Sequence, residues 1–422
     1  MKKIYYARTI CAVAALMLAV SLILGSCSLF RNDPPATSSS EEIRTNVPPI
    51  VFPELSDTPG SQTVTDAPPS TPTESVTDSE SLTDEPVTPT PTESATEPPT
   101  VEIPPIVDTS IAEYAYDDMV ADLAELAAAY SEQFSYREIG TSCDGRTLYV
   151  AILGSADAKN QIIVDAGTHG REYLTPLFVM ATLEYYLREY DTALYEGMSP
   201  SQLFSDTALY VVPMMNPDGI TISQFGAEAL LTEELRTLVR EIYQKKKDAG
   251  LTYQSFELFQ RYWKANGRGV DINRNFDVTS PNGKEYVDPP TSPDSAGYPG
   301  EHPASEPEVI AYVDLVNSLS NPIACISVHS QGNLIYWDCG QDYSGRVTAL
   351  ELANAVKGVS EFPLYYADSF TAASSDWCML AKGIPSITVE TGKGVCPLPL
   401  EQFESIFTSC KHMFLAAAHA MK

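Results

Sequence analysis

The stretch QIIVDAGTHGRE (residues 161–172) decides the fold of this chain, because it passes from an apolar run directly into a polar turn. The run QIIV is typical of a buried strand. His169 and Glu172 follow it three residues apart, and an imidazole and a carboxylate so close together can hold one metal ion. A polar turn without a function is the alternative interpretation, so the other polar residues of the chain must distinguish the two.

Apolar strands alternate with amphipathic helices along the second part of the chain. Strands are predicted at 146–154, 161–167, 207–216, 323–330 and 383–390, and helices at 112–134, 173–190, 304–320, 347–359 and 401–422. This alternation, with some strands apolar throughout, indicates an α/β fold with a mixed, mostly parallel sheet between helices. Residues 106–422 are long enough to form one such domain around a single sheet.

Residues 1–27 have the layout of an export signal, with a basic start, an apolar stretch and the ending Leu24-Gly25-Ser26-Cys27. This ending resembles a bacterial lipobox, in which the signal is cleaved before Cys27 and that cysteine receives lipid. An uncleaved transmembrane anchor is the alternative. We therefore expect an exported protein that is lipid-anchored to the outer face of the bacterial cytoplasmic membrane.

Residues 28–105 have the composition of a disordered tether. The segment holds half of the chain's 32 prolines, and acidic residues far outnumber Arg31 and Arg44. Such a sequence cannot bury enough apolar surface to offset the entropy of ordering it. Much of the net charge of −30 lies here, so that charge says little about the substrate of the domain. Lysine and arginine form no patch beyond Lys245-Lys246-Lys247, so the sequence does not favour nucleic-acid binding. We expect the protein to be a monomer.

The chain has eight cysteines, of which Cys11 lies in the signal and Cys27 would carry the lipid. The other cysteines are Cys143, Cys325, Cys339, Cys378, Cys396 and Cys410. Disulfides are possible because this number is even and the location is oxidising, but spacing does not assign their pairing. The sequence has no C-x-x-C pair, which argues against a thiolate zinc site.

Polar residues follow the ends of four predicted strands. They are His169 with Glu172, the NPDG segment at 216–219, His329 and Glu390. Ligands gather at the carboxyl ends of strands in sheets of this kind, so we expect these residues to meet at one edge. His169, Glu172 and His329 would then supply the three His and Glu ligands that catalytic zinc commonly takes. The remaining histidines, His302, His412 and His419, show no comparable partner in the sequence.

Hydrolysis at such a centre needs a base and a cation. Glu390 is the predicted base, and a structural ion pair is the alternative for this carboxylate. The segment RYWKANGRGVDINRNF offers cations for a developing oxyanion, unless it is only a solvated loop: Arg261, Lys264, Arg268 and Arg274. Asp271, in the same segment, could orient a ligand histidine.

The motifs HGRE, NPDG, WKANGRGVDINRNF, SEPE, SVHS and ITVETGKG occur in the order found in zinc carboxypeptidases of the carboxypeptidase A type, the M14 peptidases. The chain resembles this family over about residues 110–422. The resemblance implies an α/β domain with a central eight-stranded mixed sheet, one Zn²⁺ per chain, and cleavage of a terminal residue from a peptide.

The resemblance also implies roles for individual residues. His169, Glu172 and His329 match the zinc ligands, and Glu390 matches the general base that activates the zinc-bound water. Lys264 stands where digestive members have an arginine that steadies the oxyanion, as in many bacterial relatives.

Asn273 and Arg274 match the pair that binds the substrate's terminal carboxylate, a contact that arginine makes with two parallel hydrogen bonds.

One family feature is missing. Digestive members carry a tyrosine on a mobile loop, several residues before the Asp-Trp pair that corresponds to Asp376-Trp377. The matching segment here reads ADSFTAASSDW, with Phe370 nearest and Tyr365 and Tyr366 farther upstream, so a tyrosine cap is not expected. Ser375, just before Asp376, argues against a strict preference for large apolar or basic terminal residues.

The stretch ETGKGVCPLPLEQF, together with WKAN, most resembles a bacterial branch of γ-D-glutamyl-diaminopimelate peptidases, which act on peptidoglycan stem peptides. A tethered enzyme outside the membrane would meet that substrate constantly. We therefore expect a zinc peptidase that acts near a free C-terminal carboxylate of wall peptides. Cleavage of ordinary extracellular L-peptides, and a binding module built on an inactive peptidase fold, are the alternatives.

Overall fold

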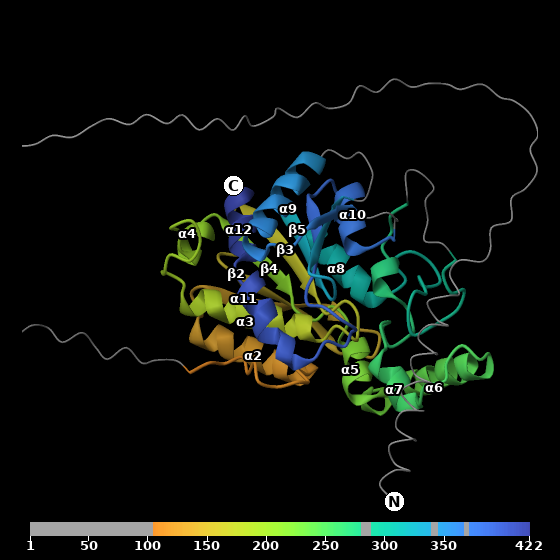
Figure 1. The fold of residues 1–422 in the computed structure, drawn as a ribbon. Coiled ribbons are helices and arrows are strands. Elements are labelled where there is room, and N and C mark those ends of the chain that lie inside the picture. Colours follow the sequence, from red (N-terminus) through yellow and green to blue (C-terminus); the bar gives the residue numbers. More distant parts are fainter. Residues whose placement is uncertain (1–103, 280–287, 339–344, 367–370) are drawn as a thin grey trace, which may run out of the picture. The chain divides into compact units, whose positions relative to one another are not determined.

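The computed structural model describes residues 104–279, 288–338, 345–366 and 371–422 (Figure 1). The predicted export signal, the lipid site at Cys27 and the tether up to residue 103 lie outside the described residues, as do Cys339 and Phe370. Among the helices in the described ranges, none is both long and apolar enough to cross a bilayer.

The centre of the domain is an eight-stranded sheet with the strand order β1-β2-β4-β3-β5-β8-β6-β7. The strands are β1 (Phe134–Thr141), β2 (Thr147–Leu153), β3 (Asn160–Ala166), β4 (Thr207–Val212), β5 (Pro322–His329), β6 (Leu334–Asp338), β7 (Leu364–Tyr366) and β8 (Ser386–Glu390). The four strands β4, β3, β5 and β8 run parallel, and so do β6 and β7, whereas the remaining neighbours are antiparallel. The predicted mixed α/β sheet is confirmed.

Helices cover both faces of this sheet (Figure 1). They are α2 (Tyr116–Ala129), α3 (Leu174–Arg188), α4 (Pro200–Leu203), α5 (Pro217–Phe225), α6 (Glu233–Asp248), α7 (Phe256–Arg261), α8 (Pro307–Ser318), α9 (Arg346–Ser360), α10 (Ser374–Leu380), α11 (Phe403–Cys410) and α12 (Met413–Ala420). Residues of α2, α3, α9, α11 and α12 share one apolar cluster with the sheet, and residues of α8 and α10 share a second cluster with its other face. A third, smaller cluster joins α5, α6 and α7 around the buried Trp263.

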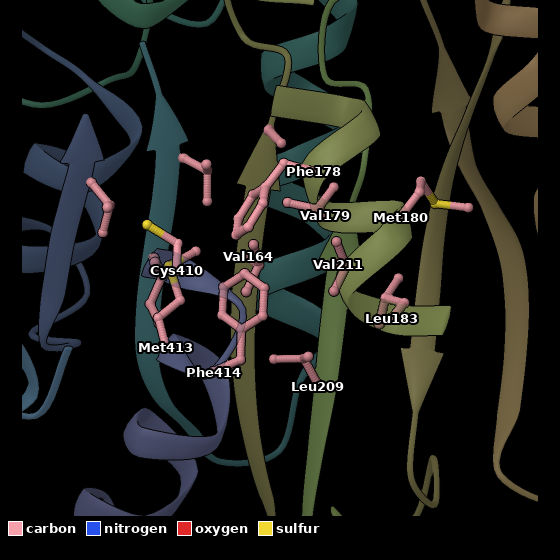
Figure 2. Packing of buried hydrophobic residues seen from close by; sticks show 14 of the residues in the cluster. Val164, Phe178, Val179, Met180, Leu183, Leu209, Val211, Cys410, Met413 and Phe414 are labelled. Atoms are coloured by element: carbon pink, nitrogen blue, oxygen red, sulfur yellow. The ribbon is translucent and has the colours of Figure 1, made fainter. Parts of the chain in front are cut away.

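The larger cluster is packed from long apolar side chains (Figure 2). Phe178 of α3 and Phe414 of α12 lie over Val164 of β3 and Val211 of β4, and all four side chains are inaccessible to solvent. Burying a side chain of this size contributes about 1.5–3 kcal/mol, so this layer holds the central strands firmly in place. The polar residues at the ends of these strands are therefore attached to a firmly packed part of the sheet.

Every residue of β3 is buried, and its side chains alternate between the two clusters. Ile162 and Val164 join the larger cluster, whereas Ile163 joins the cluster beneath α8 and α10. A strand covered on both faces is expected to be apolar throughout. Asp165 interrupts this pattern on the second face, close to the carboxyl end of the strand.

Some predicted element boundaries differ from the structure. The helix expected at 112–134 ends at Ala129, and Phe134 instead begins the edge strand β1. The strand expected at 207–216 ends at Val212, because Pro213 has no N–H group to continue the ladder. The helix expected at 401–422 is divided into α11 and α12.

The disulfides considered possible are not formed among the described cysteines. Cys143, Cys325, Cys378, Cys396 and Cys410 are all free thiols.

Candidate metal centre and active site

Three side chains from two distant parts of the sequence meet at the carboxyl ends of β3 and β5. His169 and Glu172 lie in the turn that joins β3 to α3, and His329 is the last residue of β5. Each offers a ligand atom, and these atoms all lie within 4.8 Å of one another. The two strands are parallel neighbours in the sheet, which explains why their ends deliver these side chains to one point.

The donor atoms of this group fit a zinc ion. Nδ1 of His169 lies 2.7 Å from Glu172 Oε1, and Nδ1 of His329 lies 3.0 Å from Glu172 Oε2. The two Nδ1 atoms face each other at 3.2 Å. Two imidazole nitrogens and one carboxylate, turned toward a common point and buried, form the ligand set of many catalytic zinc sites.

Asp271 lies behind His169, on the side of the imidazole ring away from Nδ1. Its Oδ1 is 3.3 Å from His169 Nε2, and its Oδ2 is 3.2 Å from the Lys264 ammonium. A carboxylate beside Nε2 favours the proton on that nitrogen, which leaves Nδ1 available for a metal. Burial alone would raise the pKa of Asp271, but Lys264, His169 and Arg274 together hold it well below its usual range. Asp271 is therefore ionised and joins the metal group to the half-buried Lys264 ammonium.

The cavity above the three ligands measures about 520 Å³. It is lined by His169, Arg171, Glu172, Lys264, Asn273, Arg274, His329, Ser330, Gln331, Tyr336, Tyr365, Tyr366, Thr371, Ala373, Ser375, Asp376, Thr388 and Glu390. The structure thus brings Glu390, Lys264, Asn273 and Arg274 into the same cavity as the metal group. Arg261 and Arg268, also considered from the sequence, do not line it.

Glu390 ends β8 and is paired in register with His329 on β5. Burial raises the pKa of the Glu390 carboxyl to about 7, and the nearby Glu172 adds to this rise, while His329 and Lys264 oppose it. A carboxyl group that titrates near neutral pH can both accept and return a proton, as a general base must.

Asn273 and Arg274 lie in the short 3₁₀ turn Ile272–Arg274, and both border the cavity. Asn273 Oδ1 accepts a hydrogen bond from the backbone N–H of Ser374 at 3.2 Å. The Arg274 guanidinium donates to the Asn273 carbonyl oxygen at 2.7 Å. Both side chains are thus tied to the backbone while they still border the cavity.

The NPDG segment has a structural task beside the cavity. The Asn216 amide donates to the carbonyl oxygens of Thr168 and Ala265, at 3.0 and 3.1 Å. It therefore fastens the turn that carries His169 to the loop that carries Lys264. A Cβ atom on Gly170 would lie only 2.3 Å from Gly219 O, so glycine is required where the His169 turn meets the first turn of α5.

Several cavity residues were not predicted from the sequence. Arg171 lies between the two ligands of the HGRE motif, and that position was the one available signal for it. Tyr336, Tyr365 and Tyr366 come from β6 and β7, which the sequence pattern did not reveal. The rings of Tyr336 and Tyr365 pack edge to face, with their centroids 6.4 Å apart. The cavity therefore has an aromatic wall, although the tyrosine of the family's mobile loop is missing from the sequence.

The histidines without predicted partners lie elsewhere. His412 Nε2 is 3.3 Å from the Tyr185 hydroxyl, and His419 packs against the ring of Tyr195. His302 contacts the carbonyl oxygen of Pro303 in an exposed loop.

Comparison with known proteins agrees with this geometry. The chain is 30% identical over 309 residues to gamma-D-glutamyl-L-diamino acid endopeptidase 1 of Lysinibacillus sphaericus, covering 72% of each chain. It is 26% identical over 256 residues to carboxypeptidase B of Rattus norvegicus, covering 58% of this chain and 52% of that protein.

Among solved structures, the fold is similar to that of thrombin activatable fibrinolysis inhibitor (TAFI), with a TM-score of 0.57 at 20% identity. The similarity covers 75% of this chain and 77% of that one. The family model for zinc carboxypeptidase (Peptidase_M14) matches residues 119–405. The chain therefore belongs to the M14 family of zinc carboxypeptidases and is a zinc metallopeptidase.

Proposed function

We propose that this peptidase hydrolyses γ-D-glutamyl–diamino acid bonds of peptidoglycan stem peptides, close to a free C-terminal carboxylate. The observation that carries the proposal is that one cavity holds the metal group, Glu390 and the Asn273–Arg274 pair together. The bacterial relative that covers most of the chain is named for this bond, and carboxypeptidase relatives match a smaller part. The polar residues Ser375 and Thr388 in the cavity suit a hydrophilic diamino acid better than a large apolar residue.

The metal group supports the first part of the reaction. His169, Glu172 and His329 would hold the Zn²⁺, which polarises the scissile carbonyl and lowers the pKa of water to about 7. Glu390 accepts the proton that the water loses as it adds to the carbonyl carbon. The same carboxyl group then returns this proton to the leaving nitrogen when the C–N bond breaks, so that no proton is gained or lost overall.

Lys264 supplies positive charge beside the reacting carbonyl. Its side chain is 15% exposed and its ammonium group is already paired with Asp271 at 3.2 Å. This pairing fixes the position of the cation before substrate binds, and a charge that is already in position stabilises a developing oxyanion. A lysine provides this charge as a point, without the planar fork of an arginine.

Arg274 and Asn273 are proposed to bind the terminal carboxylate of the substrate. The guanidinium can offer two parallel N–H groups, which match the two oxygens of a carboxylate. This contact places the scissile bond near the metal group only when a carboxylate lies a short distance beyond it, which selects substrates near their C-terminal end.

We also propose that the enzyme is exported and held at the outer face of the cytoplasmic membrane by lipid on Cys27. The support is the layout of residues 1–27 and the acidic, proline-rich segment that follows. Metabolic labelling with palmitate tests this: the wild-type chain should incorporate label and Cys27→Ser should not. Label that persists in Cys27→Ser would refute the lipid site.

A substrate panel tests the proposed bond. The full chain, loaded with zinc, is incubated with γ-linked tripeptide and tetrapeptide stems, with α-linked isomers of the same peptides, and with N-blocked L-dipeptides. Products are identified by mass spectrometry. The proposal predicts release of the diamino acid segment from the γ-linked stems and little cleavage of the other substrates. Preferential cleavage of the L-dipeptides would instead identify a general carboxypeptidase. Bound zinc without turnover on any substrate would favour an inactive binding module.

A further inference from the structure

A row of buried polar side chains lies directly beneath the catalytic cavity, on the sheet face that packs against α8 and α10. Along β5, the residues on this face change from Cys325 to Ser327 to His329 toward the carboxyl end. On the adjacent β3, the same face carries Asp165, which is paired in register with Ser327. Asp165 is 1% exposed, so it cannot touch the substrate, and the proposed mechanism gives it no role.

Three hydroxyl groups converge on Asp165. Ser327 Oγ and the Tyr312 hydroxyl donate to its Oδ2, at 2.8 and 3.3 Å, and Thr168 Oγ1 donates to its Oδ1 at 3.1 Å. A carboxylate can only accept hydrogen bonds, so a buried one needs several donors around it. The three hydroxyl groups supply these donors to Asp165. Two of these donors lie close to metal ligands in the sequence: Thr168 directly precedes His169, and Ser327 comes two residues before His329.

The hydrogen bonds continue from Ser327 toward the cavity. Ser327 Oγ is 3.0 Å from Ser374 Oγ, at the start of α10. Because Ser327 gives its single hydroxyl proton to Asp165, Ser374 must donate in the second bond. Asp165 therefore fixes the direction of both bonds and holds the first residue of α10 against the sheet.

The backbone of Ser374 then orients Asn273. Its N–H group donates to Asn273 Oδ1 at 3.2 Å, so the oxygen of that amide faces α10. The amide nitrogen is left as the group that can face the cavity, and an N–H donor is what a substrate carboxylate needs. The reversed amide would present an oxygen to the carboxylate and repel it.

We propose that Asp165 is a positioning residue, which acts through Ser327 and Ser374 to hold Asn273 in the orientation that binds the substrate's terminal carboxylate. Asp165 also accepts a hydrogen bond from Thr168, which precedes the ligand His169. The metal-binding turn and the carboxylate-binding pair are therefore both connected by hydrogen bonds to the same buried carboxylate. The distance between metal and carboxylate site is thereby fixed from beneath the cavity floor. This inference rests on the proposed function, specifically on the assignment of Asn273 and Arg274 to the carboxylate.

The test compares Ser327→Ala and Ser374→Ala with the wild-type enzyme. Ser360→Ala is the matched control, because Ser360 is also buried and its hydroxyl donates to the Val356 carbonyl within α9. Each zinc-loaded chain is assayed on one peptide with a free C-terminal carboxylate and on the same peptide as a C-terminal amide. The readout is the ratio of kcat/KM for acid to kcat/KM for amide, together with zinc content.

Ser327→Ala and Ser374→Ala should lower this acid-to-amide ratio about tenfold, mainly through KM for the acid, with zinc content and kcat nearly unchanged. Ser360→Ala should leave the ratio at the wild-type value. Ser374→Thr restores the hydroxyl group and should recover most of the ratio. A purely structural defect would slow both substrates equally, and an unchanged ratio in both alanine variants would therefore overturn the proposal.

Arg274→Ala, assayed alongside, separates two kinds of failure. If it lowers the ratio while Ser327→Ala and Ser374→Ala do not, the positioning role of Asp165 is refuted and the carboxylate assignment survives. If Arg274→Ala also leaves the ratio unchanged, the carboxylate assignment itself is wrong, and the role of Asp165 falls with it.

Discussion

His329 and Glu390 end two adjacent parallel strands and are paired in register, so the sheet itself holds a metal ligand beside the proposed base. Hydrogen bonds along β5 and β8 fix the separation of the two side chains without any loop between them. A site built on strand ends of a packed sheet is positioned more exactly than one built on loops.

The Glu390 carboxyl group is predicted to be essential for turnover but not for metal binding. Glu390→Gln keeps the size of the side chain and removes the proton acceptor, so kcat should fall by about 10²–10⁴ while zinc content stays at one per chain. Steady-state kinetics on a cleaved peptide, together with metal analysis, check this. Glu404→Gln on the exposed side of α11 is the control for the same chemical change. Full activity in Glu390→Gln would rule out the proposed base.

Asp271 is predicted to tune the metal group from behind His169. Asp271→Asn removes the charge that favours the proton on His169 Nε2, and zinc affinity should fall about 10–100-fold. Titration with a competing chelator measures this affinity. Asp277→Asn, at an exposed position six residues farther along the chain, should leave the zinc affinity unchanged. Equal affinities in the two variants would show that the contact between Asp271 and His169 has no influence on the metal.

The metal group could be predicted from the sequence because each of its parts is marked by a short local pattern, an apolar run that ends in a His or Glu residue. His169 and Glu172 follow an apolar run within one turn, and His329 and Glu390 each end another apolar run. Strand ends of a parallel sheet meet at one edge, so the sequence positions already implied that these side chains converge.

Other parts of the site depend on contacts between segments far apart in the sequence. The short edge strand β7, Leu364–Tyr366, has too few residues to show a period, so the aromatic wall of Tyr336 and Tyr365 could not be foreseen. Asp165 looks like an ordinary residue at the end of a strand. Its hydrogen-bond partner Ser327 lies 162 positions later in the chain, and Ser374, which bonds Ser327, lies 209 positions later. Only the register of β3 against β5 brings the first pair together.

Lys264 is predicted to act through its charge. Lys264→Met should lower kcat/KM by about 10²–10³, the usual effect of losing one group that stabilises an oxyanion, whereas Lys264→Arg should retain more activity. Peptide hydrolysis by the two variants, each with its zinc content verified, measures the difference. Equal activity of Lys264→Met and wild type would remove Lys264 from the mechanism.

Glu308 makes the stability of the fold depend on pH. This side chain is inaccessible to solvent, and burial together with the nearby Asp218 raises its pKa to about 7, although the Cys143 backbone N–H opposes the rise. Between about pH 4.5 and pH 7, the folded state therefore holds a proton on Glu308 that the unfolded state has released. The contribution of Glu308 to the free energy of unfolding is fully present below about pH 4.5 and is lost as pH rises through 7. A shift of this size corresponds to about 3 kcal/mol.

Urea unfolding of wild type and Glu308→Gln between pH 5 and pH 8 tests this dependence. The free energy of unfolding of the wild type should fall with pH relative to that of Glu308→Gln, whose side chain does not titrate. Parallel curves for the two proteins would show that Glu308 does not hold its proton more tightly in the folded state.

The central claim is that His169, Glu172 and His329 hold one zinc ion. Anomalous diffraction at the zinc absorption edge, from crystals of the zinc-loaded protein, tests it directly. The expected result is a single strong peak about 2.0–2.2 Å from Nδ1 of both histidines and from the Glu172 carboxylate. Cys143, Asp218 and Glu308 also place ligand atoms within 4.8 Å of one another. A peak at that second group, with none between the two histidines, would contradict the account.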